Sequence, residues 1–371
     1  MSLASFGTLQ LEWNAVARET GEMKYRDWAE RAIRYLYDRD PRTGLLPNDF
    51  HPETGEGRGV VSLGAEGDSY YEYLLKTWLQ SGKSADLAYS RTLFENAAEA
   101  AARELVQVTS EDGRMYVADR VSETGELVHK MDHLACFAGG LFALARMQEE
   151  FADRAWYEDI AAGLTETCYQ MYHANPSRLA AENYRFEGGR GAGQAPVEPD
   201  PGVDFQHSRD RTDGGAPAAW TSRTTRRRAA GADPRRRWWT EEGGGRQKRM
   251  VPGPEDGDRL SLQRPEALES MFYMWRLTKD KKYREWGWEI FEQGIERHYR
   301  VDGPEGQGYV GLEDATAPLE LLYPHDRMES FFLAETLKYL YLLFSPGDVL
   351  PLDRWVFNTE AHPMMIANSG P

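Results

Sequence analysis

The sequence predicts an all-α protein built from stacked helical hairpins, arranged either as an open solenoid or as a closed α/α toroid. Three observations favour this fold class. The first two are that apolar residues recur with a period near 3.6 along most of the 371-residue chain, and that few stretches alternate as strands do. The third is a weak internal repeat, because TGEMKYRDWAERAIRYL at 20–36 resembles TKDKKYREWGWEIFEQG at 278–294.

The apolar stripes place the expected helices in chain order. They are predicted at residues 8–20, 22–38, 69–81, 84–107, 132–150, 155–173, 265–278, 280–298 and 326–344. Two of the starts have a local reason. Asp68 before SYYEYLL suits a helix N-cap, and Pro265 suits a first helical position because its missing N–H is not needed there.

Residues 187–258 depart from this pattern. The stretch is rich in Gly, Pro and Arg, includes GGRGAGQAPVEPDPG and TTRRRAAGADPRRRWW, and has no lasting periodicity. We interpret it as a disordered insertion within a single partial helical domain, residues 1–371. A basic docking loop is one alternative. The abrupt arginine runs in an acidic protein are also compatible with a misread gene segment.

Composition narrows the classes of partner. The chain is 41% hydrophobic and 12% aromatic, and its formal charge of −16 argues against nucleic acid or an anionic membrane as the main partner. No run of about 20 apolar residues could span a bilayer, and MSLASFGTLQ lacks the features of a signal peptide. Aromatic residues suit a carbohydrate cleft and equally an ordinary core. Cys136 and Cys168 permit one disulfide and equally two reduced thiols.

Five short motifs occur together in a fixed order. They are LGAEGDSYYEYLLKTWLQSGK (63–83), MDHLACFAGG (131–140), RPEALES (264–270), RMESFFLAETLKYLYLLFS (327–345) and VFNTEAHP (356–363). Over roughly residues 5–186 and 260–366, the chain resembles the class I α-1,2-mannosidases, glycoside hydrolase family 47. The resemblance implies an (α/α)7 barrel with a C-terminal β-hairpin plug. It also implies calcium-dependent, inverting hydrolysis of terminal α-1,2-linked mannose from high-mannose N-glycans on glycoproteins.

The resemblance also implies roles for individual residues. Glu266 would be the general base and Asp68 the family's catalytic aspartate, while Glu182 matches a further catalytic acidic position, although Ala181 replaces the family's proline. Thr359 would bind the calcium ion through its hydroxyl and carbonyl oxygens, with waters and nearby carboxylates completing the shell. Contacts to the substrate would come from His133, Arg264, Glu269, Phe331, Glu335 and Glu360.

These residues also have purely structural interpretations. The alternatives are a helix N-cap for Asp68, a solvated first turn for Glu266 and Glu269, a structural role for His133, a solvated loop for Glu182, and a core ring beside a surface acid for Phe331 and Glu335. The functional interpretation makes a different prediction, namely convergence on one concavity of Asp68, Glu266, Glu269, Glu335 and Thr359.

The family pairs cysteines at the positions of Cys136 and Cys168. The resemblance therefore implies a disulfide, which contributes roughly 3–4 kcal/mol in the chain-entropy model. It also implies a location in the secretory pathway, in the lumen of the endoplasmic reticulum or the Golgi, with room for an N-terminal anchor in the parent protein.

The sequence departs from the family in two places. The family's Phe-Glu-x-x-Ile-Arg motif, which carries its proton donor, is not found, so we expect the first barrel helices to be missing and this chain to have little mannosidase activity. Glu66 stands where endoplasmic-reticulum members have arginine, which leaves the branch preference open. Two other functions remain as alternatives: a non-catalytic glycan-binding relative in glycoprotein quality control, and a helical-repeat scaffold that binds protein through its Arg-rich segment.

Overall fold

The computed structural model describes residues 1–39, 42, 44–109, 112–187, 189–191, 250–255, 257–303 and 306–367. Each helix expected from the sequence is present. The main helices are α2 (Gln10–Thr20), α3 (Lys24–Arg39), α4 (Asp68–Gln80), α5 (Ala88–Glu104), α6 (Phe137–Arg146), α7 (Trp156–His173), α8 (Glu266–Thr278), α9 (Lys282–Glu289) and α10 (Leu337–Phe344). The periodicity of the sequence therefore located the helices to within a few residues.

Shorter helical segments extend or connect these helices. A short helix α1 (Leu3–Gly7), which the sequence did not predict, precedes α2. Single 3-10 turns are η1 (Ala85–Leu87), η2 (Leu134–Cys136), η3 (Glu149–Phe151) and η6 (Leu319–Leu321). Two segments have π-helical geometry, η5 (Ile290–Tyr299) after α9 and η7 (Phe332–Thr336) before α10. The predicted helix at 326–344 thus begins later than expected, at Ser330.

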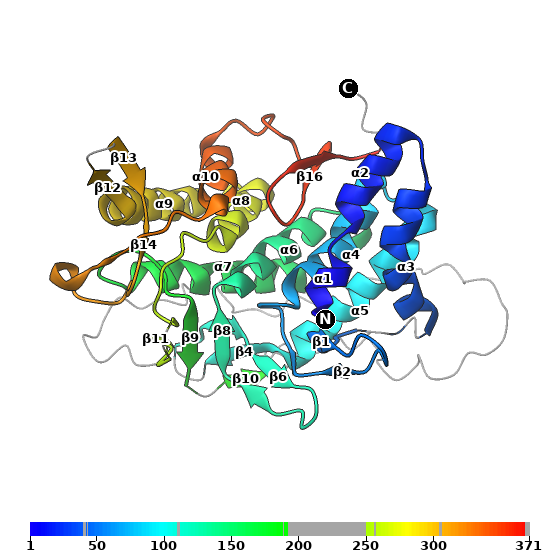
Figure 1. Cartoon of the computed structure of the whole chain (residues 1–371), viewed down its shortest axis with the longest axis horizontal. Helices are drawn as coiled ribbons and strands as arrows, with labels where there is room; N and C mark the ends of the chain where they lie inside the picture. Colours follow the sequence, from blue (N-terminus) through cyan, green and yellow to red (C-terminus); the bar gives the residue numbers. More distant parts are fainter. Residues whose placement is uncertain are drawn as a thin grey trace, which may run out of the picture.

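Neighbouring helices pack against one another: α2 contacts α3, α4 contacts α5, and α6 contacts both α7 and α8 (Figure 1). The tight packing of α6 depends on Gly139 and Gly140. A Cβ at Gly139 would lie 2.6 Å from the hydroxyl of Thr165 on α7, so only glycine permits this approach. The backbone N–H of Gly140 donates to the Ser270 hydroxyl of α8 at 2.6 Å, which joins the two helices directly.

Helix α4 lies in the core, where α1, α2, α5 and the C-terminal hairpin contact it. Its side chains are buried from Ser69 to Gln80, including the charged residues Glu72 and Lys76. A helix that is buried on all sides must supply partners for its polar groups inside the protein, because water cannot reach them. Accordingly, a carboxylate of another helix, that of Glu269, lies close to Lys76 of α4.

Short antiparallel strands lie between the helices, and of these the family resemblance implied the C-terminal hairpin alone. They are β1 (Asp49–Phe50), β2 (Gly57–Arg58), β3 (Val60–Val61), β4 (Val106–Thr109), β5 (Met115–Val117), β6 (Asp119–Val121), β7 (Leu127–Val128), β8 (Lys130–Asp132), β9 (Asn183–Phe186), β10 (Gly189–Gly191), β11 (Met250–Pro252), β12 (Arg300–Gly303), β13 (Gly306–Tyr309), β14 (Gly311–Leu312), β15 (Pro324–His325), β16 (Trp355–Phe357) and β17 (Pro363–Met365). The three-stranded sheets have the orders β10-β4-β5, β11-β9-β8 and β3-β6-β7, and the other strands pair as hairpins.

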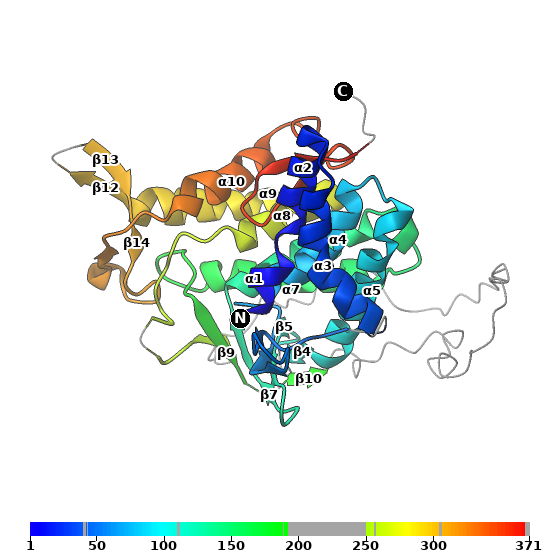
Figure 2. The same cartoon turned by 45° about the vertical axis from the view of Figure 1, so that its right-hand side comes forward.

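Most of the strands lie along one side and at one end of the helices, whereas the C-terminal hairpin lies among the helices (Figures 1 and 2). In both views β4, β9 and β10 lie below the helical layer, and the β12–β13 hairpin projects beyond α9 (Figures 1 and 2). The C-terminal hairpin β16–β17 contacts α4, and the Ala367 N–H donates to the Gln80 carbonyl at 2.7 Å. Within the described residues, none of the helices combines the length and apolar character needed to cross a bilayer.

Two strands change the predicted boundaries. The helix predicted at 84–107 ends at Glu104, because the β-branched alternation from Val106 to Thr109 pairs with β5 and β10 instead. At the edges of the predicted disordered insertion, β10 pairs with β4, and β11 pairs with β9. The prediction of disorder for 192–249 lies outside the described residues.

Candidate active site

Glu266 is the first residue of α8 and follows Pro265, whose φ of −88° already suits a helix. Glu266 and Glu269 are only 9% and 8% exposed. They therefore do not form the solvated first turn that was the structural alternative. Buried carboxylates need partners, and each of the two has a different set.

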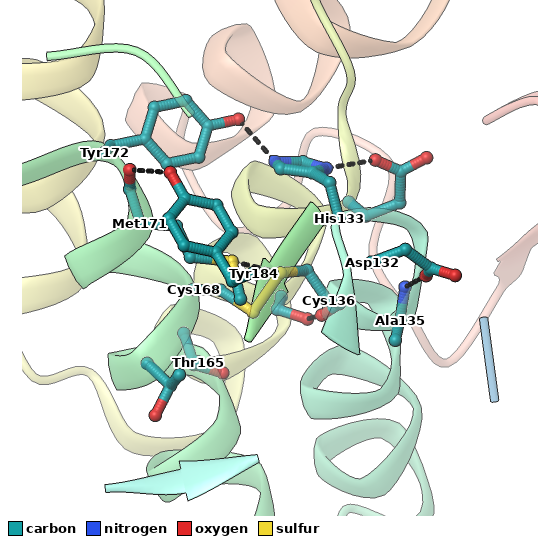
Figure 3. The surroundings of a disulfide bond; sticks show 12 residues. Asp132, His133, Ala135, Cys136, Thr165, Cys168, Met171, Tyr172 and Tyr184 are labelled. Atoms are coloured by element: carbon teal, nitrogen blue, oxygen red, sulfur yellow. Dashed lines mark hydrogen bonds and ion pairs between the residues drawn. A yellow bond between two sulfur atoms is a disulfide. The ribbon is translucent and has the colours of Figure 1, made fainter. Parts of the chain in front are cut away.

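His133 is the partner of Glu266. Its Nδ1 lies 2.8 Å from Glu266 Oε2. Its Nε2 lies 2.7 Å from the Tyr172 hydroxyl (Figure 3). Because a carboxylate only accepts, Nδ1 carries the proton and donates to Glu266, while Nε2 accepts from Tyr172. This arrangement fixes the orientation and the tautomer of the ring. Tyr172 was missed by the sequence analysis, since a tyrosine in an amphipathic helix gives no signal of such a role.

A disulfide joins the two segments that carry His133 and Tyr172. Cys136 and Cys168 are bonded, with Cα atoms 5.8 Å apart, as the family resemblance implied (Figure 3). Cys136 closes the turn η2 directly after His133, and Cys168 precedes Tyr172 by about one turn of α7. The covalent link therefore fixes η2 against α7 at the level of the histidine.

Arg264 and Glu182 form an ion pair beside Glu266. Arg264 Nε donates to Glu182 Oε2 at 2.6 Å, and the Glu182 side chain is 15% exposed, so Glu182 is not a solvated loop residue. Burial raises the pKa of Glu182, while the Arg264 charge opposes that rise. The Glu182 carbonyl accepts from the His133 N–H at 2.8 Å. Arg264 also lies over the ring of Phe331, 5.7 Å from its centroid.

Asp68 is the first residue of α4, and Gly67 is the N-cap, so the N-cap interpretation of Asp68 is displaced by one residue. Its Oδ1 accepts from the Ser69 N–H at 2.7 Å. Burial raises the pKa of Asp68 to about 7, and the negative charges of Asp132 and Glu266 add to this effect. Asp68 thus stays protonated much closer to neutral pH than an ordinary aspartate.

Glu269 faces α4 and α10. Lys76 Nζ lies 3.6 Å from Glu269 Oε1 and forms a shorter ion pair with Glu72. The Tyr339 hydroxyl donates to Glu269 Oε1 at 3.2 Å. Lys76 and Glu72 give no signal of this role in the sequence, because charged residues in a predicted helix ordinarily lie on its solvated face.

Glu335, in the π-helical segment η7, is 6% exposed. Burial raises its pKa to about 10, and the negative charges of Glu360, Glu266 and Glu269 act in the same direction. The carboxyl group also hydrogen-bonds with Glu360. A surface location for Glu335 is therefore wrong, since the structure brings it among the carboxylates of α8.

Thr359 follows the first strand of the C-terminal hairpin, and its N–H donates to the Tyr73 hydroxyl at 3.4 Å. Tyr73 in turn donates to Glu12 Oε1 at 2.7 Å, and the Asn358 side-chain amide donates to the same oxygen at 2.7 Å. No hydrogen-bond donor among the described residues reaches the buried Oε2 of Glu12. Glu12 was not predicted, because nothing within LQLEW signals this role.

The predicted carboxylates therefore do come together. Electrostatic interactions link Asp68 to Glu266, and Glu335 to Glu266, Glu269 and Glu360. Thr359 is next to Glu360 in the chain. The concavity itself stays a prediction. In the described ranges, no group of three or more His, Cys, Asp or Glu side chains is arranged to hold a metal ion by itself.

Comparisons with known proteins relate this arrangement to one family. A model described as glycosyl hydrolase family 47 matches residues 1–366. The chain is 38% identical over 367 residues to mannosyl-oligosaccharide alpha-1,2-mannosidase IA of Drosophila melanogaster, covering 98% of this chain and 44% of that protein. It is 34% identical over 366 residues to mannosyl-oligosaccharide 1,2-alpha-mannosidase IB of Mus musculus, covering 98% of this chain and 46% of that protein.

A solved structure, alpha-1,2-mannosidase from Trichoderma reesei, is similar with a TM-score of 0.73 and 25% identity, covering 98% of this chain and 66% of that one. The chain spans less than half the length of the two curated relatives named above.

Proposed function

The chain belongs to glycosyl hydrolase family 47, and on that premise we propose that this protein hydrolyses terminal α-1,2-linked mannose from high-mannose N-glycans of glycoproteins, with inversion and with bound calcium. The observation that carries the proposal is the gathering of carboxylates from separate helices, Asp68 of α4, Glu266 of α8 and Glu335 of η7. Structural helix caps and solvated acids would not converge in this way.

Glu266 is the general base of the proposed reaction. It takes a proton from the water that attacks the anomeric carbon, while a second carboxyl protonates the leaving oxygen. The hydrogen bond from His133 supports this role, because it fixes the carboxylate and leaves one oxygen, Oε1, for the water. Arg264 adds a positive charge beside Glu266.

Asp68 is our candidate for the proton donor in this chain. An acid must keep its proton until the glycosidic bond breaks, and the pKa of Asp68, raised to about 7, satisfies that condition in mildly acidic solution. The family's own donor motif was not found in the sequence. If Asp68 did not supply the proton, turnover would be slower by about 10²–10⁴-fold than in a member that carries that motif.

Calcium fits the oxygen-rich surroundings of Thr359, whose hydroxyl and carbonyl oxygens would hold it. Support comes from the unpartnered Glu12 Oε2 and from the crowding of Glu335 against Glu360, since a divalent cation would offset such excess negative charge. The ion would fix sugar hydroxyls in the site. The remaining ligands would be waters held by these carboxylates.

The finer architecture and the location follow from the same premise. We infer that this chain forms part of an (α/α)7 barrel whose lumen contains the β16–β17 hairpin, and the contact between β16 and α4 supports this arrangement. The Cys136–Cys168 disulfide supports a location in the secretory pathway, in the lumen of the endoplasmic reticulum or the Golgi, because disulfides persist in oxidising compartments.

The test measures release of mannose from α-1,2-linked mannobiose with calcium present, and α-1,3-linked mannobiose serves as the control. We expect slow release of the β-anomer from the α-1,2 linkage alone, detected by proton NMR before mutarotation. Binding of the non-hydrolysable thio-linked α-1,2-mannobiose, measured by calorimetry, tests the site independently of turnover. If the protein neither released mannose from the α-1,2-linked compound nor bound its thio-linked analogue, the proposed function would be refuted.

A further inference from the structure

Lys76 is a buried cation in the middle of α4. The residue is 1% exposed, and its ammonium group pairs with Glu72 and lies 3.6 Å from Glu269 Oε1. It also lies 5.8 Å from the centroid of the Tyr273 ring. An ammonium ion buried without partners costs several kcal/mol. The cost of burying the Lys76 charge is therefore offset by these two carboxylates, one of which, Glu269, belongs to the candidate active site.

The surroundings of Glu269 are otherwise negative or neutral. The titratable and charged groups that face it come from four elements: Glu72 and Lys76 of α4, Glu266 and Tyr273 of α8, Glu335 of η7, and Tyr339 of α10. Within this described set Lys76 supplies the positive charge. Burial raises the pKa of Glu269, and the Lys76 charge opposes that rise.

We propose that Lys76 is a positioning residue of the mannose-binding site, which holds the Glu269 carboxylate ionised and fixed beside Glu266 without itself touching the sugar. The inference rests on the proposed function, because it assigns to Glu269 the role of accepting hydrogen bonds from sugar hydroxyls. An ionised acceptor makes hydrogen bonds about twice as strong as a neutral one does. Without Lys76, the three neighbouring glutamates would favour protonation of Glu269, and the site would lose that acceptor.

The experiment measures the affinity for thio-linked α-1,2-mannobiose by calorimetry, with calcium, between about pH 5 and about pH 9. We expect Lys76→Met to weaken binding by about 10- to 100-fold near neutral pH, with partial recovery at high pH where Glu269 ionises again. Lys76→Arg, which keeps the charge, should stay within a few-fold of the wild type. The matched control is Lys83→Met, since Lys83 pairs with Glu150 at 2.6 Å, away from the candidate site.

A double mutant separates this role from a general effect on stability. If Lys76 acts through Glu269, then Lys76→Met should weaken binding little further when Glu269→Gln is already present. Fully additive losses would overturn the proposal. Unchanged affinity in Lys76→Met would also overturn it, while the proposed function would stand. Absence of binding by the wild type at every pH would refute the proposed function, and this inference would fail with it.

A second variant decides the matter if Lys76→Met does not fold, as judged by loss of a cooperative thermal transition. Glu72→Gln leaves the shape of the core nearly unchanged and removes the carboxylate that competes for Lys76. Glu269 should then ionise more readily, so binding should persist to lower pH than in the wild type. A pH dependence identical to that of the wild type would contradict the proposed role of Lys76.

Discussion

Replacement of Tyr172 by phenylalanine would remove one hydroxyl from the chain of hydrogen bonds that ends at Glu266. The hydroxyl lies 2.7 Å from His133 Nε2, and the next polar atom near it is the Arg264 carbonyl, at 3.4 Å. His133 and Tyr172 are 2% and 5% exposed, so water cannot replace the lost donor. The variant would leave His133 Nε2 buried without its partner.

The size of the effect follows from that unsatisfied atom. A buried polar group left without a hydrogen bond costs about 1–3 kcal/mol. The ring can recover part of this cost by tilting toward solvent or by changing its tautomer, and either movement disturbs the bond to Glu266 Oε2. If the whole cost is lost from the stabilisation of the transition state by Glu266, the rate of hydrolysis falls by about 5- to 150-fold, because about 1.4 kcal/mol corresponds to a factor of ten.

The assay compares kcat/KM on α-1,2-linked mannobiose for the wild type, Tyr172→Phe and the control Tyr169→Phe. Tyr169, on the same helix, also hydrogen-bonds a histidine, at 2.9 Å from His173 Nδ1, and donates to Glu289 at 2.6 Å. Both variants should lose thermal stability, but only Tyr172→Phe should lose activity. Equal losses of activity in the two variants, or full activity in Tyr172→Phe, would refute the role given to Tyr172.

Three further predictions follow from the site and its supports. Replacing Cys136 and Cys168 by alanine should lower the free energy of unfolding by roughly 3–4 kcal/mol, because the closed loop joins residues separated by 32 positions; denaturation with and without reductant measures this. Thr359→Ala should abolish calcium binding in calorimetry, and unchanged affinity would remove Thr359 from the ligands. The Asp68 pKa is raised from 3.8 to about 7, so the stability that this group contributes is complete below about pH 4 and is lost as pH rises through about 7. Asp68→Asn should therefore gain up to about 4 kcal/mol relative to the wild type between these two pH values, and equal pH dependence in thermal melts would contradict the shift.

The sequence was most informative about the helices. Helices such as α3 and α7 bury one stripe, and that stripe is visible as a period in the sequence. The strands before the C-terminal hairpin were missed because they are two to four residues long and pair with distant partners, as β10 does with β4. Such pairing is decided by tertiary contacts that a local pattern does not contain.

The site was predictable only where a motif carried it. Glu266 and His133 stand in recognisable motifs, and the structure joins them by a hydrogen bond. Lys76, Tyr172 and Glu12 were missed, because a polar residue within a helix looks the same in the sequence whether it faces water or a buried partner. Their burial depends on how α4, α7 and the C-terminal hairpin come together, which no local pattern specifies.

The π-helical geometry of η7 has a consequence for how this protein can change over evolution. A π-turn holds more residues than an α-turn does, and Glu335 lies within this segment while α10 continues directly into the core. Deletion of one residue here would restore the α-helical pitch and rotate the preceding residues by about 100° relative to α10. The identity of exposed side chains on η7 can therefore vary among descendants of this chain. The number of residues between Phe332 and Thr336 should stay constant wherever Glu335 keeps its place in the site.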